Sequence, residues 1–165
     1  MKQLAMVVLM FLLATSVGAK GQGKTEWKSP VPVDKVKLMV SDLEADPLGE
    51  HADGLRAVLL KYFDNMRPEF NVCLGQFKPL LDTEDEAQKK LWLHVPIGSG
   101  AYLLDHPEDI ENEEAYQREG MEAMLRVYEK MLAGRPATRH AFLDQLLGLR
   151  DAGKLADHVR AHRCE

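Results

Sequence analysis

The sequence predicts an all-α fold, a single compact array of about six helices behind a cleaved signal peptide and a mobile N-terminal arm. Three observations support this prediction. From Asp34 onward, apolar residues recur at steps of three and four, which is the spacing of one helix face. No stretch alternates for long with the period of two that is typical of a half-buried strand. Glycines and prolines fall between the periodic segments, where helices end.

Residues 1–19 have the pattern of a secretory signal peptide. Lys2 precedes an apolar run over 4–17, and small side chains, Ala19 among them, lie just ahead of a cleavage point before Lys20. The apolar run is too short to cross about 30 Å of hydrocarbon. We therefore expect an exported protein, periplasmic or extracellular, with no membrane insertion after cleavage.

Residues 20–33 are rich in Gly, Lys, Ser and Pro, a composition that predicts an extended or mobile arm. Trp27 is the one aromatic residue of this arm. It either docks onto the domain or is an exposed anchor for a partner, and we favour docking because large apolar side chains usually find cover. The single helical domain is then expected over 34–165.

The first helices are expected over 35–45 and 51–66, where apolar residues recur on one side. The stretch that follows, 70–82, is apolar but interrupted by Gly75 and Pro79. It is interpreted as a short helix or turn that carries Cys73.

A helix start is expected at Thr83, because three acidic residues follow this cap in the first turn. The apolar stretch after it contains Pro96. Either the helix ends near His94 and restarts, or one long helix kinks at the proline. We favour the kink, because a helical phase continues through Leu91, Val95, Gly98 and Tyr102.

The clearest helix is expected over 113–133, with Asn112 as its cap. A further helix is expected over 138–151, and a terminal helix begins near Lys154.

The charge of the chain limits its partners. The 165 residues carry a formal net charge of −5, which argues against nucleic acid, whose phosphates require a basic face. It also argues against binding to anionic lipid. A protein partner or a small-molecule ligand remains open, and no cofactor is expected.

The two cysteines, Cys73 and Cys164, predict a disulfide, because an even count in an exported chain is usually paired. The loop that it closes spans most of the mature domain. In the loop-entropy description such a closure contributes about 4 kcal/mol to stability.

Two possible catalytic groups lie near the proline-containing stretch. Ser99 is flanked directly by glycines rather than at the two-residue spacing of a nucleophile elbow, and no strand precedes it. The small residues are therefore interpreted as a place where a neighbouring helix approaches closely. His94 and His106, with carboxylates nearby, could act as general bases. His94 shares a face with apolar residues, so a hydrogen-bonded core histidine is the favoured interpretation.

The C-terminal segment holds His158 and His162, which are one helical turn apart. Two imidazoles at this spacing can bind the same zinc ion. On a helical wheel both face inward, and Cys164 points about 200° away from His162. The helix must therefore end before Cys164 if the three are to act together. Packing of the two histidines is favoured over metal binding, and a disulfide to Cys73 is favoured for the cysteine.

Two hypotheses of function follow. The favoured one is an exported, non-catalytic helical module that binds a protein or small ligand in the cell envelope. The alternative is a small exported hydrolase that uses His94 and His106 with carboxylates, or a metal at His158 and His162. Possible contact residues for a ligand or partner are Trp27, His94, Tyr102, His106 and the methionines Met121, Met124 and Met131, although methionines on an apolar helix face are more often core.

Overall fold

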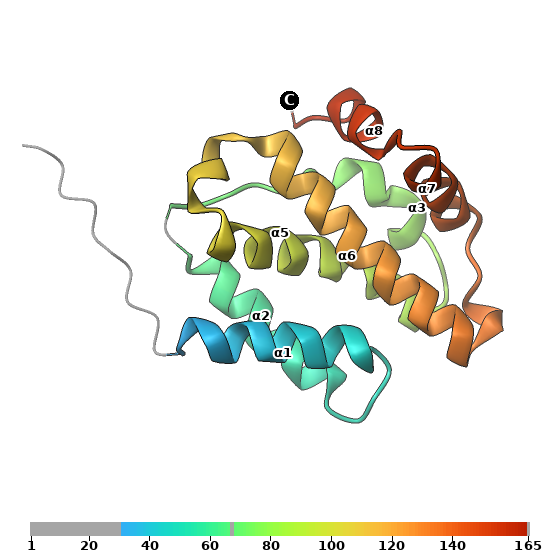
Figure 1. The fold of residues 1–165 in the computed structure, drawn as a ribbon. Coiled ribbons are helices and arrows are strands. Elements are labelled where there is room, and N and C mark those ends of the chain that lie inside the picture. Colours follow the sequence, from blue (N-terminus) through green and yellow to red (C-terminus); the bar gives the residue numbers. More distant parts are fainter. Residues whose placement is uncertain (1–30, 67, 165) are drawn as a thin grey trace, which may run out of the picture.

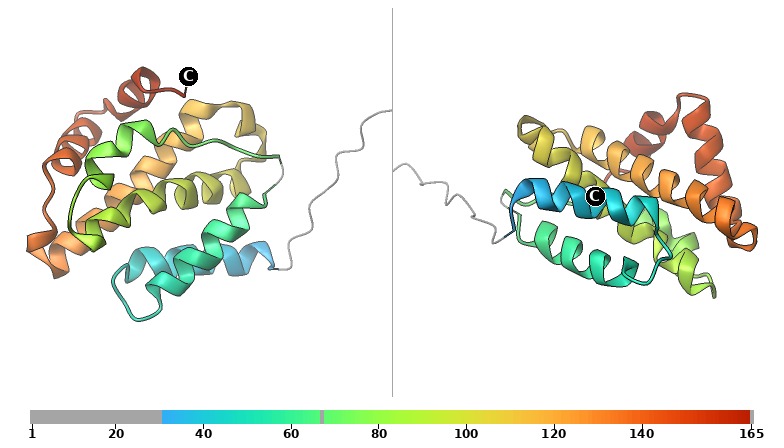
Figure 2. Two further views of the ribbon diagram at one scale, coloured as in Figure 1. Left: turned by 180° about the vertical axis from the view of Figure 1, so that it is seen from behind. Right: turned by 60° about the horizontal axis from the view of Figure 1, so that its bottom comes forward.

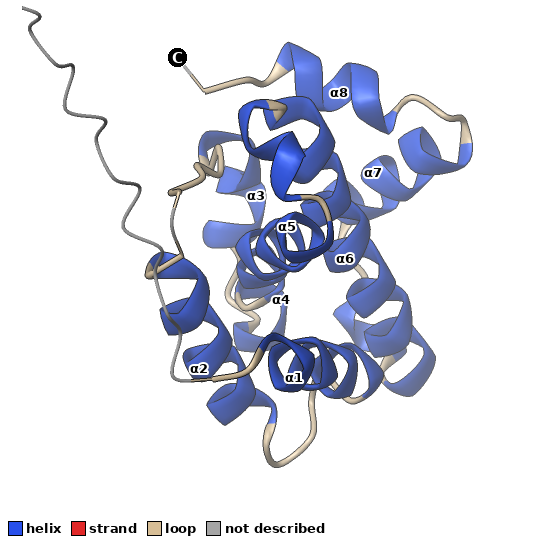
Figure 3. Cartoon of the chain, turned by 60° about the vertical axis from the view of Figure 1, so that its left-hand side comes forward, coloured by secondary structure: helices blue, strands red, loops and turns tan. Residues whose placement is uncertain are grey.

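The structure is a computed structural model that describes residues 31–66 and 68–164. These residues form helices and loops without a strand, so the predicted all-α class is confirmed (Figures 1 and 3). Six of the α-helices are longer than a single turn, and α3 and α4 have four residues each. The proposed signal peptide, most of the proposed arm and Trp27 lie outside the described residues.

Helices α1 (Val33–Ala45) and α2 (Ala52–Asp64) pack side by side at one edge of the molecule (Figure 1). Helix α1 buries Val36, Val40 and Leu43, whose spacing of four and three places them on one face. Both helices match the ranges that their periodicity predicts, although α1 begins within the segment assigned to the arm.

Helices α5 (His94–Asp105) and α6 (Glu113–Gly134) cross closely at the centre of the fold (Figure 3). A Cβ at Gly98 would lie 2.4 Å from the Cβ of Ala123, and one at Gly120 would lie 2.3 Å from the Oγ of Ser99. Ser99 is fully buried and donates a hydrogen bond of 2.8 Å to the carbonyl of Tyr116. The interpretation of these small residues as a close helix contact is therefore confirmed.

The expected long helix with a kink at Pro96 is wrong. Helix α4 (Glu86–Lys89) ends, a 3₁₀ turn over Leu91–Leu93 follows, and α5 begins at His94. Pro96 then lies in the first turn of α5, where no backbone N–H is needed by the helix. The cap of α4 is Asp85 rather than Thr83, since its carboxylate accepts from the backbone N–H groups of the second and third helical residues.

The other face of α6 is covered by α3 (Lys78–Leu81), α7 (Ala141–Asp151) and α8 (Leu155–Ala161). A 3₁₀ turn over Gly75–Phe77 precedes α3, and two more join the later helices over Pro107–Glu111 and Pro136–Thr138. As predicted, Asn112 caps α6 by accepting from the N–H of Ala115 at 3.3 Å. Among the described residues, no helix combines the length and the apolar composition needed to cross a membrane.

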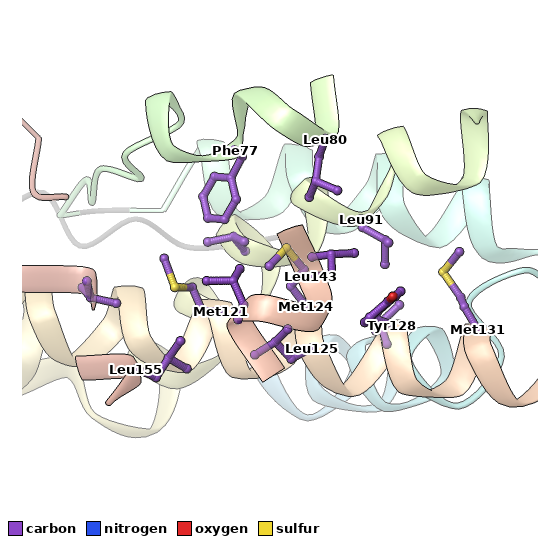
Figure 4. Packing of buried hydrophobic residues seen from close by; sticks show 14 residues of the cluster. Phe77, Leu80, Leu91, Met121, Met124, Leu125, Tyr128, Met131, Leu143 and Leu155 are labelled. Carbon is purple, nitrogen blue, oxygen red and sulfur yellow. The ribbon is translucent and has the colours of Figure 1, made fainter. Parts of the chain in front are cut away.

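The three candidate methionines lie in the core on this face of α6. Met121, Met124 and Met131 are at most 2% exposed and pack with Phe77, Leu80 and the α7 residue Leu143 (Figure 4). They therefore offer no surface to a partner in this conformation, and their role as contact residues is not supported.

Candidate functional site

A groove of about 770 Å³ lies between the second half of α2 and the start of α5. Its third side is the extended segment 69–74, which runs from α2 toward α3 (Figure 2, left). We call this segment the wall. The residues around the groove are apolar and aromatic on its floor and polar at its edge: Leu60, Lys61, Phe63, Asp64, Asn65, Glu69, Phe70, Asn71, Val72, Leu74, Trp92 and Pro96.

The floor of the groove depends on a glycine of α5. A Cβ at Gly100 would lie 2.2 Å from the ring of Phe63, so only glycine lets that ring lie against α5. Phe63 also packs edge-on against Tyr62, with ring centroids 5.2 Å apart. The floor is therefore held in place from both helices.

The wall is attached to α6 by aromatic contacts. Phe70 packs edge-on against Tyr116, with centroids 5.8 Å apart, and the backbone of Asn71 hydrogen-bonds to the Tyr116 hydroxyl. Burial raises the pKa of that hydroxyl above its usual value, so it stays neutral at physiological pH. Leu74 ends the wall with 43% of its surface exposed.

A covalent link lies within the wall. The sulfur atoms of Cys73 and Cys164 are 1.98 Å apart, at disulfide distance, although 91 residues separate them in the sequence. Cys73 is buried, and its carbonyl accepts from the Nε2 of Gln76 at 3.1 Å. We call this pair the latch, because it connects the wall to the C-terminal residues.

The chain past α8 is placed by charge as well as by the latch. Helix α8 ends at Ala161, before Cys164. This is the condition stated above for Cys164 to act together with the two histidines of α8 and its end. Arg160 donates to both carboxylate oxygens of Glu114 at 2.9 and 2.8 Å, and Arg163 donates to one of them at 3.2 Å. The hydrogen bond from Arg160 is the main reason that the pKa of Glu114 lies below its usual value.

Two polar side chains of α6 lie beside the latch. The Oε1 of Glu113 is 3.2 Å from the Cys73 sulfur and accepts from the Nε2 of Gln117 at 2.5 Å. The ligand atoms of Cys73, Cys164 and Glu113 all lie within 4.8 Å of one another, which is a spacing that could hold a metal ion. Sulfur in a disulfide is not a thiolate, so these atoms form a ligand set only after reduction.

His94 is a buried hydrogen-bonded histidine, as the favoured interpretation expects. It is 1% exposed, and its Nε2 accepts from the Nε of Arg56 at 3.3 Å. Burial and the nearby guanidinium lower the pKa of His94 to about 3. The guanidinium of Arg56 also donates to Asp53 at 2.6 Å and to the carbonyl of Pro47, so this cluster ties the α1–α2 loop to α5.

His94 and His106 are not brought together. They lie at opposite ends of α5, about 18 Å apart at 1.5 Å per residue. His106 is half exposed, stacks on Tyr102 at 4.5 Å and lies 3.6 Å from a carboxylate oxygen of Glu108. The Tyr102 hydroxyl donates to Asp109, and this bond is the main reason that its pKa rises to about 12. The two histidines cannot act on the same bond in this arrangement.

The terminal histidines lie side by side, with ring centroids 4.2 Å apart. The expectation that both face inward is wrong for His162, which is exposed at the end of α8 and donates from its Nδ1 to the carbonyl of His158 at 2.8 Å. Helix α8 ends at Ala161, so His162 follows the last helical residue and does not keep the inward direction of the helix face. Burial lowers the pKa of His158, which opposes its protonation.

The groove was not identified from the sequence. Its wall falls in the stretch 70–82 that periodicity left ambiguous, and Trp92 and Phe70 had no pattern that would separate them from core residues. A usable signal was present: an apolar segment without helical or strand periodicity that carries one cysteine of a pair.

Comparison with known proteins found no match: no protein-family model, no curated protein and no solved structure matches this chain.

Proposed function

We propose that this protein is an exported, non-catalytic helical module that binds one small amphipathic molecule in the groove. The observation that carries the proposal is the groove itself, because its volume of about 770 Å³ falls within the range of about 300–1,000 Å³ of small-molecule sites. An aromatic and aliphatic floor would take an acyl or aromatic body. The amides and charges at the edge would face a polar head.

The latch supports both parts of the proposal. A disulfide is typical of exported proteins, since the cytosol keeps thiols reduced. A wall held to the rest of the fold before the ligand arrives also lowers the entropy lost on binding. The groove is thus a preformed site rather than one that must be ordered by its ligand.

The edge of the groove suits a molecule with a charged or polar head. Lys61 supplies a cation, Asp64 and Glu69 supply carboxylates, and Asn65 and Asn71 supply amide groups that donate and accept. Trp92 offers a large flat surface beside them. A suitable probe is 8-anilinonaphthalene-1-sulfonate, because it combines an aromatic body with one sulfonate that Lys61 can face.

The test is a fluorescence titration of the oxidised protein with this probe. The chain has two tryptophans, so Trp27→Phe leaves Trp92 as the reporter in the groove. Saturable quenching of Trp92 with one probe per chain is expected. A titration without saturation, or with several equal sites, would contradict the proposal.

A pair of matched variants then locates the site. Leu74 and Leu81 are exposed to nearly the same extent, 43% and 45%, but only Leu74 borders the groove. Leu74→Glu should weaken probe binding about tenfold, because an apolar contact is replaced by a charge that must keep its water. Leu81→Glu should bind like the parent protein, and equal losses in both variants would place the probe elsewhere.

A further inference from the structure

The atoms around the latch form a set of metal ligands that the disulfide keeps out of use. The Cys73 and Cys164 sulfurs and a carboxylate oxygen of Glu113 lie within 4.8 Å of one another. A disulfide sulfur carries no proton, so the 3.2 Å contact between Cys73 and Glu113 is not a hydrogen bond in this form. The Glu113 carboxylate therefore has no hydrogen bond from the Cys73 sulfur while the disulfide is intact.

Gln117 gives an independent indication of a ligand at this place. It is 1% exposed, and its Oε1 has no hydrogen-bond partner among the described residues. Its Nε2 lies 3.1 Å from the Cys73 sulfur, 3.9 Å from the Cys164 sulfur and 2.5 Å from Glu113. Rotation about the last side-chain bond exchanges the two amide atoms, which would turn the unpaired oxygen toward the sulfurs. A cation between this oxygen and the sulfurs would give the oxygen the partner that it lacks.

We propose that the reduced protein binds one Zn²⁺ ion at Cys73, Cys164 and Glu113. A dithiol reductant supplies two electrons and two protons to the S–S bond, leaves two thiols on the protein and itself becomes a disulfide. Zn²⁺ then displaces both thiol protons to solvent and binds two thiolates and the carboxylate. Thiolate sulfur and carboxylate oxygen are both ligands that Zn²⁺ takes.

The surroundings allow the small movement that a metal requires. Cys164 lies past the end of α8, so its sulfur can withdraw from Cys73 without distorting a helix. Glu113 is in the first turn of α6, and Gln117 lies one turn further along the same helix face, so both side chains can reach an ion beside the sulfurs. The fourth position is left for the Gln117 oxygen or water. The ion would then join the wall to the C-terminal residues in place of the disulfide.

The test uses Co²⁺ as a coloured substitute and Zn²⁺ as its competitor. The protein is reduced with a phosphine and titrated with Co²⁺ in the absence of oxygen. One Co²⁺ per chain, with the absorption of tetrahedral thiolate coordination, is expected, and Zn²⁺ should displace it. The oxidised protein should show neither signal. No uptake by the reduced protein, or equal uptake by the oxidised one, would overturn the proposal.

Variants of two carboxylates test the third ligand. Glu113→Gln removes the ligand with almost no change of shape and should weaken Co²⁺ binding at least tenfold. Glu111→Gln, an exposed neighbour that removes the same charge, should bind like the wild type. Equal affinity in both variants would overturn the site as proposed.

Circular dichroism of the same samples guards against loss of structure. If reduction lowers the helix content, Zn²⁺ should restore it, because metal binding at a folded site stabilises the fold. Metal uptake without that recovery would place the ion on the unfolded chain and would also overturn the proposal.

Discussion

At the scale of single residues, His94 gives the most direct pH dependence. The pKa of His94 is about 3 in the folded protein, below its ordinary value of 6.5. Between these two pH values the histidine is therefore protonated in the unfolded chain and neutral in the folded protein. The stability linked to His94 is complete above about pH 6.5. It is lost as the pH falls toward 3, at about 1.4 kcal/mol per pH unit.

Urea unfolding of the wild type and of His94→Gln at pH 7 and pH 5 measures this effect. Glutamine keeps an acceptor for Arg56 but does not titrate. The free energy of unfolding should fall by about 2 kcal/mol more in the wild type than in the variant over this interval. Equal pH dependence of the two proteins would show that His94 titrates normally.

At the scale of elements, the crossing of α5 and α6 determines the fold. A Cβ at Gly120 would meet the backbone carbonyl oxygen of Val95 at 2.5 Å, and backbone cannot move aside cheaply. Gly120→Ala should therefore cost about 1–3 kcal/mol, the usual range for an overpacked core. Thermal or urea unfolding measures it.

Gly148 in α7 is the control for that substitution. A Cβ there meets nothing within 4 Å. Gly148→Ala should stabilise the protein by about 0.5–1 kcal/mol, because alanine favours the helix. Similar effects at both positions would show that the contact between α5 and α6 is looser than described.

The elements also show what the sequence can and cannot predict. The start of α6 was predictable because Asn112 caps it and acidic residues follow, which are local features. The position of the wall was not, because residues 69–74 make no regular local hydrogen bonds and are placed by Tyr116 and Cys164, far along the chain. The prediction of a kink at Pro96 is wrong for a related reason. The spacing of the apolar residues around Pro96 fits a kinked helix and the first turn of a new helix equally well.

At the scale of the whole molecule, the latch closes most of the described chain into one loop, because its two cysteines are 91 positions apart. Cys164→Ser should lower the free energy of unfolding by about 2–4 kcal/mol, mainly because the unfolded chain without the disulfide has more conformational entropy. Urea unfolding under non-reducing conditions measures the loss. A thiol count on unfolded, unreduced wild type should find none, and two free thiols would show that the latch is open in the isolated protein.

The claim that the groove is a ligand site is tested most directly by hydrogen exchange read by mass spectrometry, because this measurement locates a bound ligand. With the anilinonaphthalene probe present, backbone amides of 60–65, 69–74 and 92–96 should exchange more slowly, because these three segments surround the groove. Amides of α8, which does not border it, should be unchanged. Protection confined to other segments, or none with the probe at saturation, would contradict the claim.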